Sequence, residues 1–185
     1  SEASAGTDAS DDVLVFGIGT GDLVDTALAG RQGRVIAWDR DPWLLRKLLD
    51  RKDYRRALNN GKLVLKLGAS IVSECDTLRA LSRVDHPLLA QIYKNEHALL
   101  NDGVGEKRAL VCTGTLFVDD LSDALRAEGY TVYSWDLKRL AKEELVWGAL
   151  QVQPALVAAI NYSYGLAEMC TALGCPLVVW EIDPS

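Results

Sequence analysis

The feature that most constrains the fold of this chain is an apolar strand that runs into alternating glycines. Val13–Phe16 is typical of a buried strand, and Asp22–Gly30 has the pattern of a helix. The turn between them contains Gly17, Gly19 and Gly21. Glycines at this spacing let backbone N–H groups approach a bound nucleotide closely, with a helix N-terminus behind them. The sequence therefore predicts the strand–turn–helix unit that opens many parallel α/β sheets.

A second predicted strand ends in an acid that suits a ribose. The strand Arg34–Trp38 is followed by Asp39, which lies 22 residues after Gly17. An acidic side chain at that distance can accept hydrogen bonds from ribose hydroxyls. The three glycines and Asp39 are therefore the candidate cofactor-binding residues. Arg40 and Asp41, which come next, are expected to be solvated loop charges.

The glycine spacing also discriminates between ligands. A dinucleotide fingerprint would need a glycine where this chain has Asp22. The GxGxG pattern resembles the first motif of S-adenosylmethionine methyltransferases, and this resemblance implies S-adenosylmethionine as the ligand. The chain departs from that class at Val15 and at Ala69, where the class carries acids. The alternative is that the glycines only shape a tight strand-to-helix turn.

Composition narrows the classes of function. Of the 185 residues, 49% are hydrophobic and 25% are charged, which is ordinary for a globular chain. The net charge of −6 argues against broad binding of nucleic acid or anionic membranes, and no apolar run is long enough to span a bilayer. The cysteines, Cys75, Cys112, Cys170 and Cys175, include no CxxC pair. We therefore expect reduced, buried thiols in a cytoplasmic protein, and no metal site.

Strand and helix patterns alternate along the chain and predict an α/β fold of two small Rossmann-like parallel-sheet modules joined by a long helix. Ser73–Ser82 is expected to be helical, and His86–Asn101 is expected to be one continuous helix. The predicted organisation is a disordered lead-in at 1–12, a methyltransferase-like βαβ module at 13–85, a bridging helix and linker at 86–106, and a second module at 107–185.

The second module offers a candidate substrate site. Its predicted strands are Arg108–Thr113, Thr131–Trp135, Ala155–Ile160 and Pro176–Glu181. Because the carboxyl ends of parallel strands share one edge of the sheet, the loops that follow them can line one cleft. The candidate substrate-binding residues in these loops are Thr113, Asn161, Tyr164 and Asp183, with Glu181 beside them. The alternative is that Asn161 caps a helix and Asp183 belongs to a turn.

Several short motifs carry a family resemblance. They are AWDRDPWLL at 37–45, LRAEGYTV at 125–132, QPALV at 153–157 and LGCPLVVWEIDP at 173–184. Together they resemble the N-terminal region of bacterial glycosyltransferases of the spore-maturation-protein-like group. The resemblance implies a two-Rossmann (GT-B) transferase in which Asp183 lies at the lip of the acceptor cleft.

The resemblance also implies a division of labour. Such enzymes hold the nucleotide-sugar mainly in a C-terminal Rossmann domain, whereas this chain stops at Ser185. We therefore expect the acceptor-side portion of a glycosyltransferase-like protein, inactive alone, with a nucleotide-sugar and an acceptor as ligands. No catalytic residue is assigned. Two other functions stay open: an S-adenosylmethionine-dependent methyltransferase relative, and a non-catalytic Rossmann- or receiver-like module that contacts a protein partner.

Overall fold

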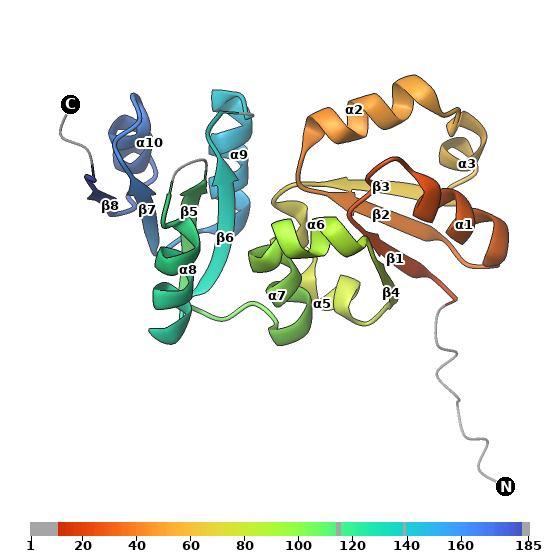
Figure 1. Ribbon diagram of the computed structural model, residues 1–185, viewed down its shortest axis with the longest axis horizontal. Helices are drawn as coiled ribbons and strands as arrows, with labels where there is room; N and C mark the ends of the chain where they lie inside the picture. The colour runs from red at the N-terminus through yellow and green to blue at the C-terminus, as the bar shows by residue number, and fades with distance from the viewer. Residues whose placement is uncertain (1–10, 114–115, 139, 183–185) are drawn as a thin grey trace, which may run out of the picture.

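The computed structural model describes residues 11–113, 116–138 and 140–182. It contains two four-stranded sheets, with the strand orders β3-β2-β1-β4 and β6-β5-β7-β8 (Figure 1). Every strand pairing in both sheets is parallel. The strands are β1 (Val13–Phe16), β2 (Val35–Asp39), β3 (Leu63–Leu67), β4 (Ser82–Asp85), β5 (Arg108–Thr113), β6 (Thr131–Asp136), β7 (Leu156–Ile160) and β8 (Leu177–Trp180).

Helices connect the strands, and the predicted α/β fold class is confirmed. The helices are α1 (Asp22–Gly30), α2 (Pro42–Arg51), α3 (Arg55–Asn59), α4 (Ser70–Ser73), α5 (Cys75–Arg79), α6 (Pro87–Ile92), α7 (Lys94–Asp102), α8 (Val118–Ala127), α9 (Lys142–Val152) and α10 (Leu166–Ala172). All four strands expected in the second module form one parallel sheet. Asp41 starts α2, where its side chain accepts a hydrogen bond from the Trp43 N–H and Pro42 takes the first helical position.

The helix predicted over Ser73–Ser82 is confirmed only in part, because it extends too far toward Ser82. Helix α5 occupies part of this stretch, but Ser82 begins β4, which pairs with β1 at the edge of the first sheet. Strand β4 reads Ser-Arg-Val-Asp, and its first residue is exposed. An edge strand with one apolar residue gives little period-two signal, so the sequence pattern does not reveal it.

The predicted continuous helix over His86–Asn101 is wrong, because it is broken at Tyr93. The backbone there has φ −98° and ψ 41°, which separates α6 from α7. The break turns the Tyr93 ring inward, where it lies edge-on to both Phe16 and Trp38. Burial of this ring inside the fold is favourable and compensates for the interrupted helix.

One hydrophobic core is common to the two sheets. Leu14 and Trp38 of the first sheet belong to the same buried cluster as Leu110 and Trp135 of the second. A separate cluster lies under α1 and α2, and a third lies between α8 and the second sheet. The two sheets are therefore packed against a shared interior, with α7 between them alongside β6 (Figure 1).

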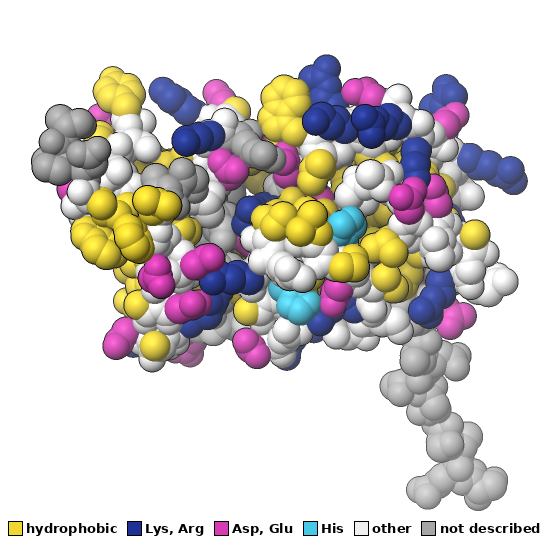
Figure 2. Space-filling model, in the orientation of Figure 1, with side chains coloured by type: hydrophobic (Ala, Val, Ile, Leu, Met, Phe, Trp, Pro, Cys, Tyr) yellow, Lys and Arg dark blue, Asp and Glu magenta, His cyan; other side chains and the backbone are white. Residues whose placement is uncertain are grey.

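The predicted lead-in 1–12 is described only at its end, because residues 1–10 lie outside the described part. Asp12 is buried, and its carboxylate accepts hydrogen bonds from Arg34. Acidic and basic side chains are interspersed over the face in Figure 2. Within the described residues, no helix has the length and apolar character needed to cross a membrane.

Candidate functional site

The glycine turn lies directly beneath the start of α6. Gly17, Gly19 and Gly21 have φ values of 81°, 51° and 90°, a region that favours glycine. A Cβ on Gly19 would lie 2.5 Å from Nε2 of His86, and one on Gly17 would lie 2.8 Å from Cβ of Leu89. The space over the turn is therefore occupied by side chains of this chain.

Asp39 lies beside the turn but is buried, with 1% of its surface exposed. One carboxylate oxygen accepts a hydrogen bond from the Ile18 N–H at 2.9 Å. The other accepts hydrogen bonds from the Asp41 N–H at 2.8 Å and from the Tyr93 hydroxyl at 2.9 Å. Burial raises the pKa of Asp39 above its ordinary value, although these three hydrogen bonds oppose the shift.

Gly17, Gly19 and Gly21 thus lie in one turn, with Asp39 beside it. The Asp39 carboxylate is engaged by three donors from within the fold, and His86 lies over Gly19. That the turn holds a nucleotide or S-adenosylmethionine remains a prediction. Such a ligand would need His86 and the start of α6 to move away.

Arg40 and Asp41 are not the solvated loop charges that the sequence suggested. The Arg40 side chain is 15% exposed, and its Nη1 atom lies 3.3 Å from Oε2 of Glu96, which is fully buried. The guanidinium carbon lies 4.4 Å from the centre of the Tyr93 ring. Burial alone would lower the pKa of Arg40, but the charge of Glu96, with smaller contributions that include Asp136, raises it. Arg40 is therefore a cation held inside a cleft.

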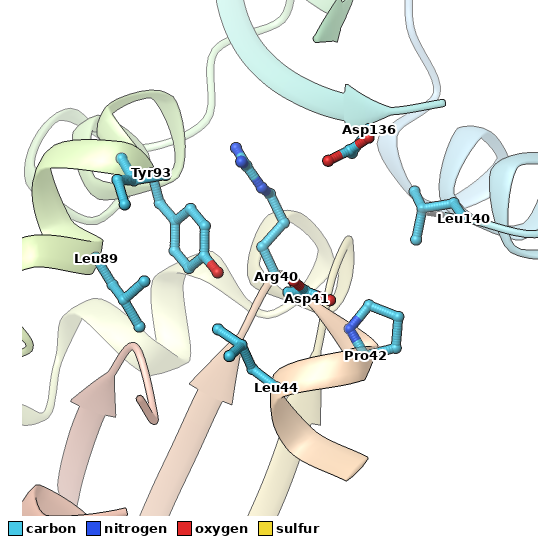
Figure 3. Close-up of a pocket in the computed structure, with 9 residues that line it drawn as sticks. Arg40, Asp41, Pro42, Leu44, Leu89, Tyr93, Asp136 and Leu140 are labelled. Atoms are coloured by element: carbon cyan, nitrogen blue, oxygen red, sulfur yellow. The ribbon is translucent and has the colours of Figure 1, made fainter. Parts of the chain in front are cut away.

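The cleft opens where the carboxyl ends of the two sheets meet. A cavity of about 310 Å³ lies there, near the lower end of the roughly 300–1,000 Å³ typical of small-molecule sites. Figure 3 shows Arg40 extending from the end of β2 toward Tyr93, with the Asp136 carboxylate across from it at the end of β6. The cavity is lined by Arg40, Asp41, Pro42, Leu44, Leu89, Ile92, Tyr93, Asp136 and Leu140.

Glu96 fixes the two sheets around this cavity. Its Oε1 atom accepts a hydrogen bond from the Ser134 N–H of β6 at 2.9 Å, while its Oε2 atom contacts Arg40. Next to it, the Asn95 side chain donates to the hydroxyls of Ser134 and Ser122. Because β6 is an edge strand, α7 satisfies a backbone donor that would otherwise have no partner in the sheet.

Three of the predicted substrate-binding residues, Thr113, Asn161 and Tyr164, lie at the carboxyl edge of the second sheet. The Thr113 hydroxyl donates to the Trp135 carbonyl. Tyr164 is 88% exposed, and the Lys142 ammonium lies 5.9 Å from the centre of its ring. Asp183 is outside the described residues. Their role in substrate binding stays a prediction.

Two loops of this edge are tied together by reciprocal hydrogen bonds. The Asn161 side-chain oxygen accepts from the Ile182 N–H at 2.9 Å, and the Glu181 carboxylate accepts from the Tyr162 N–H at 3.0 Å. Asn161 itself has φ 59°, a left-handed conformation that asparagine tolerates better than most residues. The loops after β7 and β8 are therefore braced against each other at the carboxyl edge of the second sheet, and neither loop lines the cavity around Arg40.

Sequence reasoning missed Arg40, Tyr93, Glu96 and Asp136 as site residues. One signal was present: Arg40 and Asp136 both stand at the carboxyl end of a strand, where ligands bind in open α/β sheets. Tyr93 and Glu96 had no such signal, because the predicted continuous helix concealed the break that aims the tyrosine inward.

The four cysteines are free thiols, and all of them are buried. Burial raises the pKa of Cys112 to about 12, with a smaller contribution from Cys170. The described residues contain no group of three or more His, Cys, Asp or Glu side chains that could hold a metal ion.

In comparisons with protein-family models, curated proteins and solved structures, nothing matches this chain. What the structure establishes is two parallel α/β sheets, consistent with two Rossmann-like modules. Any function has to be supported by the residues of the cleft themselves.

Proposed function

We propose that this chain forms the acceptor side of a sugar-transfer site, as the GT-B glycosyltransferases that its motifs resemble would require. The supporting observation is the convergence of Arg40, Asp41 and Asp136 on one cavity between the carboxyl ends of two parallel sheets. Ligands of open α/β sheets bind at that edge.

The chemistry of the cavity suits a hydroxylated, uncharged ligand. Sugar hydroxyls donate to carboxylates and accept from guanidinium N–H groups, and the lining offers both kinds of group. The apolar side chains of Leu44, Leu89 and Leu140 supply surface for the carbon skeleton. The diphosphate of a nucleotide-sugar would instead lie near the carboxylates of Asp41 and Asp136, which repel it.

The proposal therefore gives this chain the acceptor and leaves the nucleotide-sugar donor to a second Rossmann face. Transfer requires both substrates in near-attack geometry. On this proposal, the purified chain does not turn over a nucleotide-sugar by itself.

The test is an NMR titration of the ¹⁵N-labelled chain with neutral monosaccharides (glucose, galactose, mannose and N-acetylglucosamine) and with UDP-glucose. We expect at least one monosaccharide to shift the amide signals of Arg40, Tyr93 and Asp136. Asp136→Asn should weaken this response, whereas Asp50→Asn on the exposed side of α2 should not.

Three results would contradict the proposal. The first is the absence of any shift around Arg40 with all four monosaccharides. The second is hydrolysis of UDP-glucose by the isolated chain. The third is tight, Asp39-dependent binding of S-adenosylmethionine in calorimetry, which would favour a methyltransferase relative instead.

A further inference from the structure

An apolar surface is left uncovered on the second sheet, away from the cleft. Val178 and Trp180 of the edge strand β8 are 54% and 52% exposed, whereas Leu177 and Val179 between them are partly buried. This alternation means that one face of β8 is covered and the other is open.

The open face is the one that α8 covers elsewhere in the sheet. Val178 pairs with Ala158 of β7, and Ala158 belongs to the cluster beneath α8, with Val111 and Val132. Helix α8 therefore covers this face as far as β7 and leaves the side chains of β8 bare. In Figure 1, β8 lies at the outer end of the sheet, with α8 in front of β5.

Two further residues extend the open surface toward the start of α8. Phe117 is 49% exposed and lies 6.1 Å, centre to centre, from the Trp180 ring. Leu116 beside it is 75% exposed. We call the four residues Leu116, Phe117, Val178 and Trp180 the β8 surface. Apolar side chains gather in this part of Figure 2, next to acidic side chains.

Parallel sheets occur almost only with helices over both faces. The opposite face of this sheet meets that condition, because Leu145 and Ala149 of α9 and Leu166 and Cys170 of α10 are buried in the core. On the β8 surface, the position parallel to α8 at an ordinary helix-to-helix spacing of about 8–10 Å is unoccupied by the described residues. Large exposed apolar patches of this kind mark interaction sites.

The rim of the surface is acidic. Asp119 and Asp123 of α8 pair with Lys94, and Asp123 also pairs with Arg126, so cations offset both of these carboxylates. Among the described residues, neither Asp120 nor Glu181 forms an ion pair, and both are exposed. The charge that complements this rim is positive.

We propose that the β8 surface binds an amphipathic α-helix of a partner polypeptide, with its apolar stripe on Val178 and Trp180 and with Lys or Arg along its flanks. Such a helix would continue the layer that α8 begins and would bury the exposed rings. The 310 Å³ cavity proposed as the sugar site includes none of the four residues, although Leu116 and Phe117 line a neighbouring cavity with Arg40. Val178 and Trp180 belong to neither cavity, so variants at these two positions test this inference separately from the sugar site.

The test uses two fluorescent helical peptides of about 18 residues, a length at which such helices become appreciably stable. One has leucines at i, i+3, i+4 and i+7 with lysine elsewhere, and the other replaces lysine with glutamate. We expect the whole chain to bind the leucine–lysine peptide in fluorescence anisotropy and to bind the leucine–glutamate peptide much more weakly. Val178→Asp and Trp180→Ser should each weaken binding by at least about tenfold, and Asp120→Lys should weaken it less.

A matched control separates the β8 surface from general stickiness. Trp147 of α9 is 52% exposed, the same fraction as Trp180, but lies on another helix. Trp147→Ser should leave binding unchanged, and circular dichroism should show that every variant is folded. The proposal is overturned if neither peptide binds, if both bind equally, if Val178→Asp has no effect, or if ultracentrifugation shows that copies of the chain already cover this surface in one another.

Discussion

Nη1 of Arg40 and Oε2 of Glu96 lie 3.3 Å apart, and this pair connects the first sheet to the second. Arg40 follows β2, while Glu96 on α7 also accepts the Ser134 N–H of β6. A single buried carboxylate thus fixes the position of the cation in the cavity and the position of the strand across from it.

Breaking this pair should be costly. Glu96→Gln keeps an oxygen for Ser134 but places an amide beside Arg40, and we expect a loss of about 3 kcal/mol in the free energy of unfolding. In the double variant with Arg40→Met, the loss should be smaller than the sum of the two single losses, because no unpaired charge remains. Urea titrations of the four proteins give this coupling energy. Additive losses would show that the pair does not act as a unit.

Removing the Asp39 carboxylate should destabilise the fold more than removing one of its hydrogen-bond donors. Asp39→Ala leaves the Ile18 N–H, the Asp41 N–H and the Tyr93 hydroxyl without their acceptor, and we expect a loss of about 2–4 kcal/mol. Tyr93→Phe removes a single hydrogen bond and should cost about 1 kcal/mol. Thermal unfolding followed by circular dichroism compares the two. Equal losses would indicate that Asp39 contributes little through the glycine turn.

The contact between Gly19 and His86 gives a third prediction. Gly19→Ala should destabilise the fold, because the new methyl group meets the imidazole and the φ of 51° suits glycine. In a His86→Ala background the clash disappears and only the backbone cost of about 1 kcal/mol remains. The loss caused by Gly19→Ala should therefore be smaller in that background. A loss that is unchanged would mean that His86 does not rest on the turn in solution.

The four thiols should be protected in the native state. Burial raises the pKa of Cys75, Cys112, Cys170 and Cys175, so little thiolate is present near pH 8. We expect no rapid reaction with Ellman's reagent until denaturant is added, when all four react. A fast-reacting thiol in the folded chain would contradict this.

The same shifts predict how stability depends on pH. For Cys112, the folded-state pKa of about 12 lies above the ordinary value of 9.0. The unfolded state therefore loses its proton first, and the stability from this buried thiol is present below pH 9.0 and is lost as the pH rises from there toward 12. Cys112→Ser should reduce this alkaline decline in urea titrations. The sign would be wrong if the wild-type chain became more stable over that range.

The sequence pattern predicts the fold of this chain better than it predicts the residues of the cleft. Strands such as Val13–Phe16 and Leu63–Leu67 are apolar and bounded by turn residues, so their type and limits follow from local chemistry. The sequence pattern does not predict strand β4, because Val84 is its only apolar residue. This segment is a strand because it pairs with β1. The sequence around Tyr93 has a helical pattern throughout. The helix is interrupted there because the Tyr93 ring packs into the core, a long-range contact that the local sequence does not indicate.

The cleft depends on contacts between distant residues, which explains what the sequence pattern could not give. From the local sequence, Arg40 is predicted to be a loop charge. Only the fold places Glu96, 56 positions later in the chain, beside it. Asp39 has the position of a ribose-binding acid, but its three donors are found only once the chain has folded. Thr113 and Asn161, in contrast, were placed at one sheet edge by strand order alone, and both lie there.

The interior that spans both sheets has a consequence for cooperativity. Leu14 and Trp38 share one cluster with Leu110 and Trp135, so neither half can lose its structure without uncovering the other. We expect a single unfolding transition, with equal calorimetric and van't Hoff enthalpies. Proteolysis between Gly103 and Glu106 should not release two stable fragments. Although the chain contains two sheets, we expect the two sheets to fold and unfold together as one cooperative unit.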